Sequence, residues 1–293
     1  MVLPDSILAA DGGRRIAFAQ DNLANDFRRA QVLEVRDALG KHPQVTFEYS
    51  DAQGRTSLLI QQIDDFIRRR IDVIIVGTSD EQAVVPVLKK ARDSGIPVIV
   101  LDRGVKTDQY TTFIHSDNFL IGQMGGEYIA QQLKGQGRVL LFEGLPSADV
   151  TKLRTKGFLD VMARHPGIEV TRRTGNYLRR DAVLEFEKIV AAGASFNAIF
   201  SESDSMLSGV RVVLEKHRMD PSKIIMIGCD YTNEAREAIR AGKQTGSVLF
   251  PLGGRAAVGA ALEILGGKRV PKHIVIPVRL VTKDDVEQTP PIF

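Results

Sequence analysis

The sequence predicts an α/β protein of two similar lobes, each a doubly wound parallel sheet, and three observations lead to this prediction. Short apolar runs alternate with amphipathic stretches along the chain, which is typical of parallel strands covered by helices on both faces of a sheet. The same order of elements then occurs a second time. The length of 293 residues leaves room for two domains of ordinary size.

Five apolar runs in the first half of the chain predict strands. They are IAFAQ (16–20), VTFEY (45–49), DVIIVG (72–77), PVIVLD (97–102) and TTFIHSD (111–117). Three segments between these runs have the apolar spacing of helices, namely 27–39, 57–70 and 83–95. The last of them ends at Gly95 with Pro97 beyond it, which is a helix-stop signal.

The second half of the chain repeats this order. RVLLFEG (138–144) corresponds to RRIAFAQ (14–20), FNAIFSESD (196–204) to IDVIIVGTSD (71–80), KIIMIGCD (223–230) to PVIVLD, and TGSVLF (245–250) to TTFIHSD. In both halves a strand ends in an acid, Asp80 or Asp204, and the next strand ends in Asp102 or Asp230. Ligands of open parallel sheets bind beyond the carboxyl ends of the strands. Two facing lobes would therefore bring Asp102, Arg103 and Asp230 to one cleft.

Composition and motifs exclude several classes of function. A net charge of +3, from 39 basic and 36 acidic residues, gives no argument for a nucleic acid or a membrane surface as partner. The single cysteine, Cys229, excludes an internal disulfide and a thiolate metal cluster. The five histidines have no metal-ligand spacing. Neither a nucleophile elbow around Ser203 nor a phosphate loop in the helical stretch 122–127 is present. We therefore expect no catalytic residues, no metal and no cofactor.

Several motifs together resemble a known family. They are AQDNLANDFR (19–28), GIPVIVLDR (95–103), HSDNFLIGQMGGEYIA (115–130), LRTKGF (153–158), SESDSMLSG (201–209) and IGCDYTNEAREAIRAGK (227–243). Over about residues 11 to 285 the chain resembles the periplasmic sugar-binding proteins of the ribose-binding type, which have the type I periplasmic binding fold. It is most similar to the members that serve galactofuranose and related sugars.

The resemblance implies an architecture and a biological role. Its two lobes, 11–116 plus 251–277 and 117–250 plus 278–293, would be joined by a three-segment hinge with the ligand cleft between them. The protein would close on one monosaccharide and deliver it to the membrane permease of an ABC importer, with no reaction of its own. We expect a monomer that binds no nucleic acid.

The resemblance also implies a location. The first ten residues, MVLPDSILAA, lack the basic start and apolar core of a signal peptide. Taken alone, they leave open a cytoplasmic protein or one whose signal was removed and replaced by a new Met. The resemblance implies the periplasm, with the native signal peptide absent from this sequence.

The resemblance further implies ten ligand-binding residues. They are Asn25, Phe27, Arg28, Asp102, Arg103, Asn118, Arg154, Tyr177, Ser203 and Asp230. Three positions depart from the family pattern: Gly77 replaces a frequent Asn, Ser203 replaces the Asn that usually precedes the acid, and Leu249 or Phe250 takes the place of a polar residue.

The residue types suit a sugar. A carboxylate accepts two hydroxyls and a guanidinium donates a rigid pair of hydrogen bonds, so Asp102 and Arg103 are able to clamp neighbouring hydroxyls. Phe27 and Tyr177 would offer apolar faces to the C–H groups of the ring. Arg28 stands where ribose binders have a second aromatic, which favours a hexose whose exocyclic diol reaches Arg28, with galactofuranose as the leading candidate.

Each of these residues also has a purely structural interpretation. Asp102 and Arg103 would then form a strand-end salt bridge that caps a loop, and Phe27 would be core packing. Tyr177 would lie on a solvent-facing loop. Arg28 and Arg29 would be solvated residues at a helix start, and Arg154 would belong to a solvated basic face.

Two other functions remain as alternatives. Lac repressor-like transcription regulators share the two-lobed sugar sensor but carry about sixty residues of DNA-binding domain and hinge ahead of it, whereas the first strand here begins near Arg14. A sugar-modifying enzyme on a doubly wound fold is the third possibility, against which the lack of a nucleophile, a metal set and a phosphate loop counts.

Overall fold

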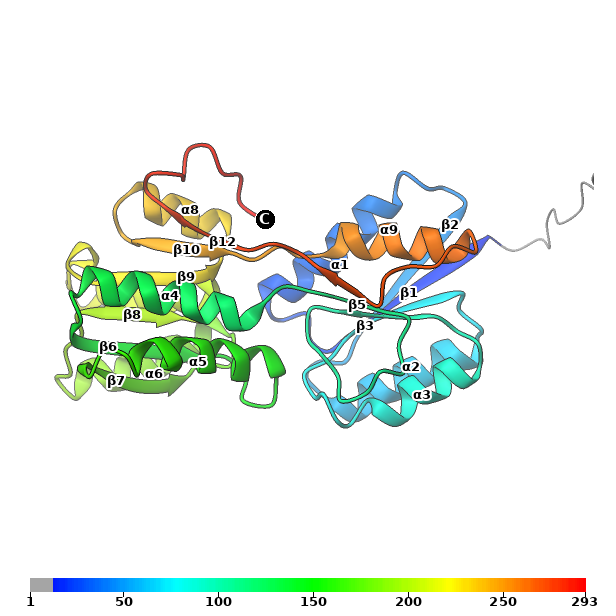
Figure 1. Cartoon of the computed structure of the whole chain (residues 1–293), viewed down its shortest axis with the longest axis horizontal. Coiled ribbons are helices and arrows are strands. Elements are labelled where there is room, and N and C mark those ends of the chain that lie inside the picture. The colour runs from blue at the N-terminus through cyan, green and yellow to red at the C-terminus, as the bar shows by residue number, and fades with distance from the viewer. Residues whose placement is uncertain (1–12) are drawn as a thin grey trace, which may run out of the picture.

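The computed structural model describes residues 13–293 and has two lobes side by side, each built on one six-stranded sheet (Figure 1). This confirms the predicted α/β class with two parallel-sheet lobes. The interpretation of residues 1–10 as lacking a signal peptide, and the predicted start of the first lobe at residue 11, lie outside the described residues.

The first sheet has the strand order β11-β5-β4-β3-β1-β2, and all its neighbouring strands pair in parallel. Its strands are β1 (Arg14–Gln20), β2 (Val45–Asp51), β3 (Val73–Gly77), β4 (Val98–Leu101), β5 (Thr112–His115) and β11 (His273–Val275). Helices α2 (Thr56–Arg68) and α3 (Val85–Asp93) pack on one face. Helices α1 (Asp26–Leu39) and α9 (Gly254–Leu265) pack on the other.

The second sheet repeats this topology in the order β12-β10-β9-β8-β6-β7. Its strands are β6 (Gln136–Glu143), β7 (Gly167–Thr174), β8 (Ala198–Ser201), β9 (Ile225–Asp230), β10 (Gly246–Leu249) and β12 (Arg279–Thr282). Helices α4 (Asn118–Gln132) and α5 (Asp149–Met162) cover one face. Helices α6 (Arg179–Ala191) and α7 (Asp204–Lys216) cover the other, next to the short 3₁₀ helix η1 (Pro221–Lys223). Helix α8 (Asn233–Arg240) follows β9. The repeat read from the sequence is thus confirmed strand by strand.

One strand breaks the symmetry, because β12 runs antiparallel to β10. The chain leaves β11 at the carboxyl end of the first sheet and reaches β12 after three residues, 276–278. The carboxyl ends of both sheets face the same junction, so a strand that enters the second sheet from there runs against its neighbour. The chain also passes between the sheets at 116–117, before α4, and at 250–253, before α9 (Figure 1).

Helices α4 and α5 approach each other closely through two glycines. A Cβ atom on Gly122 would lie 2.0 Å from the carbonyl oxygen of Arg154, and one on Gly157 would lie 2.1 Å from the carbonyl oxygen of Phe119. Only glycine permits this backbone contact. The pair therefore fixes α5, and with it Arg154, against the rest of the second lobe.

We expect Gly157→Ala to lower the free energy of unfolding by about 3 kcal/mol, because the added methyl group meets backbone that cannot move aside. Urea denaturation followed by circular dichroism measures this. Gly259→Ala is the control, since Gly259 also lies in a helix and nothing is within 4 Å of its added Cβ. That change should stabilise by roughly 0.5–1 kcal/mol. Equal stability of Gly157→Ala and the unaltered protein would contradict the packing described.

Candidate functional site

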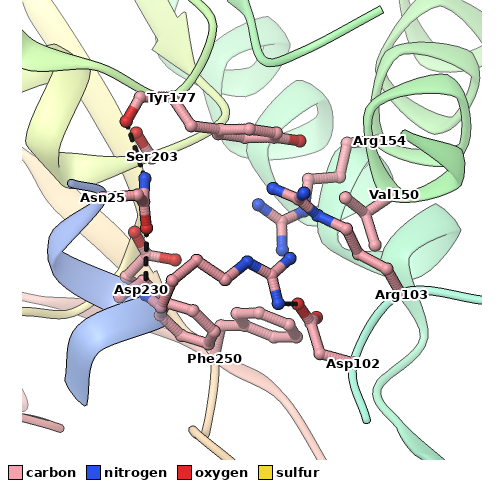
Figure 2. A pocket seen from close by; sticks show the side chains of 11 residues that line it. Asn25, Asp102, Arg103, Val150, Arg154, Tyr177, Ser203, Asp230 and Phe250 are labelled. Carbon is pink, nitrogen blue, oxygen red and sulfur yellow. Dashed lines mark hydrogen bonds and ion pairs between the residues drawn. The ribbon is translucent and has the colours of Figure 1, made fainter. Parts of the chain in front are cut away.

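A pocket lies where the carboxyl ends of the two sheets meet (Figure 2). It is lined by Asn25, Phe27, Arg28, Asp102, Arg103, Val150, Arg154, Tyr177, Ser203, Asp230 and Phe250. Nine of the ten residues expected from the sequence are in this lining, and Asn118 is the tenth. Residues more than two hundred positions apart in the chain are thus brought to one site from both lobes.

The two strand-end acids occupy equivalent positions and have the same unusual backbone. Asp102 follows β4 with φ of 72°, and Asp230 ends β9 with φ of 110°. Positive φ is uncommon for non-glycine residues, although Asp adopts it more often than most. Hydrogen bonds hold both turns. The amide of Asp102 donates to the carbonyl of Ile114 (2.7 Å), and the amide of Tyr231 donates to Asp204 Oδ2 (2.8 Å).

Buried ion pairs organise the first-lobe side of the pocket, and Asp21 also lies 3.8 Å from Arg28 Nε through its Oδ1. Arg28 Nη1 lies 2.6 Å from Asp102 Oδ2, and Arg103 Nη1 lies 2.8 Å from Asp21 Oδ2. In the stretch of chain that the structure describes, no ion pair joins Asp102 to its neighbour Arg103, so the interpretation of these two as a simple strand-end salt bridge is wrong. Burial, together with the nearby charge of Arg28, lowers the pKa of Arg103.

The pairs leave some buried polar atoms without a partner in the protein. Asp102 Oδ1 and Arg103 Nε are both fully buried, and neither makes a hydrogen bond within residues 13–293. Leaving such atoms unpaired is costly unless a bound molecule supplies the partner. One is an acceptor and the other a donor, and both belong to residues of the pocket lining.

The second-lobe side is built around Arg154. Its Nε donates to Asn118 Oδ1 (2.8 Å), its Nη1 donates to the carbonyl of Glu202 (2.6 Å), and its guanidinium lies 4.6 Å from the ring centre of Phe250. Asn118 therefore orients Arg154 and does not line the pocket. Because Arg154 is only 3 % exposed, its interpretation as part of a solvated basic face is wrong.

Asp230 is the acid of the second-lobe side, and it differs from Asp102. Among residues 13–293 no basic side chain lies within ion-pair distance of its carboxylate. Burial raises the pKa of Asp230 well above its ordinary value, although the positive charge of Arg154 opposes this rise. The Asp230 carboxyl group thus lines the pocket without a charged partner. Its surroundings favour a bound molecule that is uncharged and that forms a hydrogen bond with it.

Aromatic rings form two sides of the pocket. Phe27 and Phe250 stack with ring centres 5.0 Å apart and planes 15° apart. Tyr177 lies against the backbone of Gly144, where an added Cβ would be 1.9 Å from the Tyr177 ring. The Tyr177 hydroxyl is 2.8 Å from Thr151 Oγ1, and burial raises the pKa of Tyr177. Tyr177 is 5 % exposed, so its interpretation as a solvent-facing loop residue is wrong.

The two arginines at the start of α1 have different environments. Arg28 is 2 % exposed, and its side chain also reaches Gln31 Oε1 at 3.0 Å, so the solvated interpretation is wrong for Arg28. The solvated interpretation is correct for Arg29, whose side chain is 62 % exposed. Asn25 caps this helix by accepting from the amide of Arg28 (3.0 Å). The first turn of α1 is thus fixed by a residue of the pocket itself.

Direct contacts between the lobes close the pocket. Asn25 Nδ2 donates to the carbonyl of Tyr177 (2.7 Å), and the amide of Gly104 donates to Asp149 Oδ2 (2.8 Å). At the rim, Lys152 Nζ is 2.8 Å from Glu81 Oε1. Burial raises the pKa of Asp149. Because these contacts join residues of different lobes, the structure is a closed form.

Four residues of the site were not singled out from the sequence. Asp21 follows β1 and Glu202 follows β8, so the rule that strand ends meet at the cleft was sufficient to find both. Val150 and Phe250 had no such signal, because an apolar residue reads as core in a sequence. Phe250 was noted only as standing in place of a polar residue.

Two further searches cover residues 13–293. No group of three or more His, Cys, Asp or Glu side chains in this range has the arrangement to hold a metal ion. Within the same range, none of the helices combines the length and apolar character needed to cross a membrane.

Comparisons with known proteins bear on this site. A family model described as a periplasmic binding protein domain matches residues 16–269. The ribose import binding protein of Bacillus subtilis is 28 % identical over 80 % of this chain and 76 % of its own length. The galactofuranose-binding protein of Escherichia coli is 25 % identical over 80 % of this chain and 76 % of its own length. An ABC transporter solute-binding protein of Bacillus halodurans, solved with bound myo-inositol, matches with a TM-score of 0.90 and 27 % identity over 96 % of this chain and 98 % of that one.

The two strand-end acids should respond differently to substitution. Asp102→Ala removes the nearest acid of the buried Arg28 and leaves it only Asp21, at 3.8 Å. Breaking a buried pair typically costs about 3–5 kcal/mol of stability. Asp230→Asn removes a carboxyl group that has no ion pair. In the unfolded chain Asp230 ionises near pH 4, whereas the folded protein holds its proton to higher pH. The unaltered protein should therefore lose more stability than the Asn variant as pH rises above about 4. Chemical denaturation at several pH values measures both. A larger loss at pH 7 for Asp230→Asn than for Asp102→Ala would contradict this account.

Proposed function

Starting from the fact that the chain belongs to the periplasmic binding protein family, we propose that it binds one neutral monosaccharide between its two lobes and serves as the binding component of an ABC importer in the periplasm. The observation that carries the proposal is the pocket at the junction of the two sheets, where charged and polar side chains from both lobes converge (Figure 2). The protein acts by binding and carries out no reaction of its own.

The charges around the pocket favour an uncharged ligand. Two of the three buried arginines, Arg28 and Arg103, are matched by the buried acids Asp102 and Asp21, and the third, Arg154, donates to Asn118 and to the carbonyl of Glu202. A ligand with its own charge would disturb this balance inside a site from which water is largely excluded, and an uncompensated buried charge is expensive. A sugar acid or an amino sugar is therefore a poor fit.

The unpaired polar atoms favour hydroxyl groups. A hydroxyl both donates and accepts a hydrogen bond, so a pair of ring hydroxyls satisfies Asp102 Oδ1 and Arg103 Nε, two of the buried atoms that have no hydrogen-bond partner within residues 13–293. The stacked rings of Phe27 and Phe250 offer an apolar surface to the C–H groups of the same ring. This combination of hydroxyl-binding groups and an apolar wall suits a monosaccharide.

Within the monosaccharides we propose a hexose, with galactofuranose as the first candidate. Arg28 lines the pocket and is buried, and its Nη1 serves Asp102 and Gln31. A guanidinium has five N–H donors, so further donors remain for an exocyclic hydroxyl of the ligand. The relatives named above are a ribose import binding protein, a galactofuranose-binding protein and a protein solved with bound myo-inositol, which supports a small polyhydroxylated ring as the ligand.

We also propose how binding is linked to transport. The lobes, 11–116 plus 251–277 and 117–250 plus 278–293, would move about the three segments that connect the sheets. A ligand that touches both lobes binds the closed form better than the open form and shifts the population toward it. The permease would then recognise the closed monomer.

A thermal-shift screen tests the ligand class. D-galactose, methyl galactofuranosides, D-ribose and myo-inositol form the neutral set, and D-galacturonate and D-galactosamine are their charged counterparts. A neutral sugar at 100 times its dissociation constant should stabilise the fold by about 2.7 kcal/mol. We expect the galactose forms to stabilise more than ribose, and the charged analogues to have little effect. Stabilisation by a charged analogue with none by any neutral sugar would contradict the proposal.

A further inference from the structure

A buried acid lies directly behind the pocket without lining it. Glu202 follows β8 and is fully buried. Its Oε2 accepts from the amide of Gly144 (2.8 Å) and from the hydroxyl of Tyr177 (3.4 Å), and its carbonyl accepts from Arg154 Nη1 (2.6 Å). Glu202 therefore supports two side chains of the pocket, one through its carboxyl group and one through its backbone.

The other carboxyl oxygen of Glu202 shares a hydroxyl with a second acid. Thr155 Oγ1 is 2.7 Å from Glu202 Oε1 and 3.0 Å from Glu143 Oε1. A hydroxyl group carries one hydrogen and donates one such bond, while ionised carboxylates only accept. If both acids were ionised, one of these two short contacts would have no hydrogen in it.

A proton on Glu202 resolves this conflict. Glu143 is paired with Arg172, whose Nη2 is 2.5 Å from Glu143 Oε1, so Glu143 is the ionised member. Glu202 Oε1–H then donates to Thr155 Oγ1, and the Thr155 hydroxyl donates to Glu143. The Glu202 Oε2 atom stays free to accept from Gly144 and Tyr177, so every contact in the cluster has its hydrogen.

The surroundings of Glu202 agree with a neutral acid. Burial raises the pKa of Glu202 to about 7, against the hydrogen bonds from Gly144 and Thr155 and the charge of Arg154. The charge of Glu143 acts in the same direction as burial. The other ionisable groups that sense Glu202 are Tyr177, Arg172 and Cys229.

We propose that Glu202 is a proton-linked positioning residue, whose neutral form, held by the chain Glu202–Thr155–Glu143, keeps Tyr177 and Arg154 in place for the ligand. This inference rests on the proposed function, because it treats Tyr177 and Arg154 as ligand contacts. When the proton is lost, two carboxylates compete for one hydroxyl hydrogen and repel each other. The support behind the Tyr177 ring then loosens, and the affinity for the ligand falls.

Glu202→Gln tests the protonation without any ligand. The amide donates to Thr155 and accepts from Gly144, as the neutral acid does. Between the unfolded value of 4.5 and about 7, the folded protein holds a proton that the unfolded chain has lost, so its stability falls as pH rises through this window. Thermal unfolding should show this fall relative to Glu202→Gln. Glu169→Gln, at an exposed acid of β7 outside the cluster, should follow the unaltered protein.

Glu143→Gln is a second variant that locates the proton. With one acceptor removed, Thr155 is free to donate to an ionised Glu202, so the midpoint of the stability change should move to lower pH. The carboxyl ¹³C resonance that disappears in Glu202→Gln should titrate near pH 7 in the unaltered protein and at lower pH in Glu143→Gln. A Glu202 resonance that titrates near its unfolded value in both would overturn the inference.

Calorimetry with D-ribose, D-galactose and myo-inositol at pH 6 and pH 8 tests the link to binding. The unaltered protein should bind up to roughly tenfold more weakly at pH 8, one unit above the titration, and Glu202→Gln should bind equally at both values. Binding by the unaltered protein with no such dependence, or the same dependence in Glu202→Gln, would overturn the link. If none of the three sugars binds, the proposed function fails, and the unfolding profiles still decide whether Glu202 holds the proton.

Discussion

Charges buried at the junction of the two lobes must find their partners inside the protein, and this constraint shapes the site. The pairs Arg28–Asp102 and Arg103–Asp21 join the end of β1, the first turn of α1 and the end of β4. Breaking either pair leaves a charge that neither water nor the core can accommodate. Asp102 has a left-handed backbone conformation, and its carboxylate contacts Arg28 and not its neighbour in sequence, Arg103.

The same constraint determines which polar groups of the pocket remain free to bind a ligand. Protein groups satisfy most of the donors and acceptors, and in the pocket lining Asp102 Oδ1 and Arg103 Nε remain without a hydrogen-bond partner within residues 13–293. Asn25 and Asp149 use their side chains to reach backbone groups of the opposite lobe. Closure and the completion of the pocket are therefore one event, since the contacts that hold the lobes together involve residues of the pocket or their immediate neighbours. Behind Tyr177, the proposed proton on Glu202, held in the chain Glu202–Thr155–Glu143, supports the same pocket.

Much of the fold and of the site was predictable from the sequence, because the periodicity of apolar residues and the repeated order of strands indicate parallel sheets. The doubled order of strands predicted both lobes, and the strand-end rule predicted that Asp102 and Asp230 lie together. It did not predict that Asp102 and Arg103 take separate partners, since that depends on a positive φ that no residue type at this position signals. Phe250 was missed as a lining residue because only three-dimensional placement separates a pocket wall from core. Asn118 was expected to contact the ligand, yet the structure gives it the task of orienting Arg154.

The central claim is that the two lobes close on a neutral monosaccharide, and small-angle X-ray scattering tests it most directly. The protein without sugar is compared with the protein saturated in turn with D-galactose, a methyl galactofuranoside, D-ribose and myo-inositol. The account predicts a monomer whose radius of gyration decreases with at least one of these sugars, to the value calculated from the closed structure. An identical radius of gyration with and without every sugar that calorimetry shows to bind would contradict it.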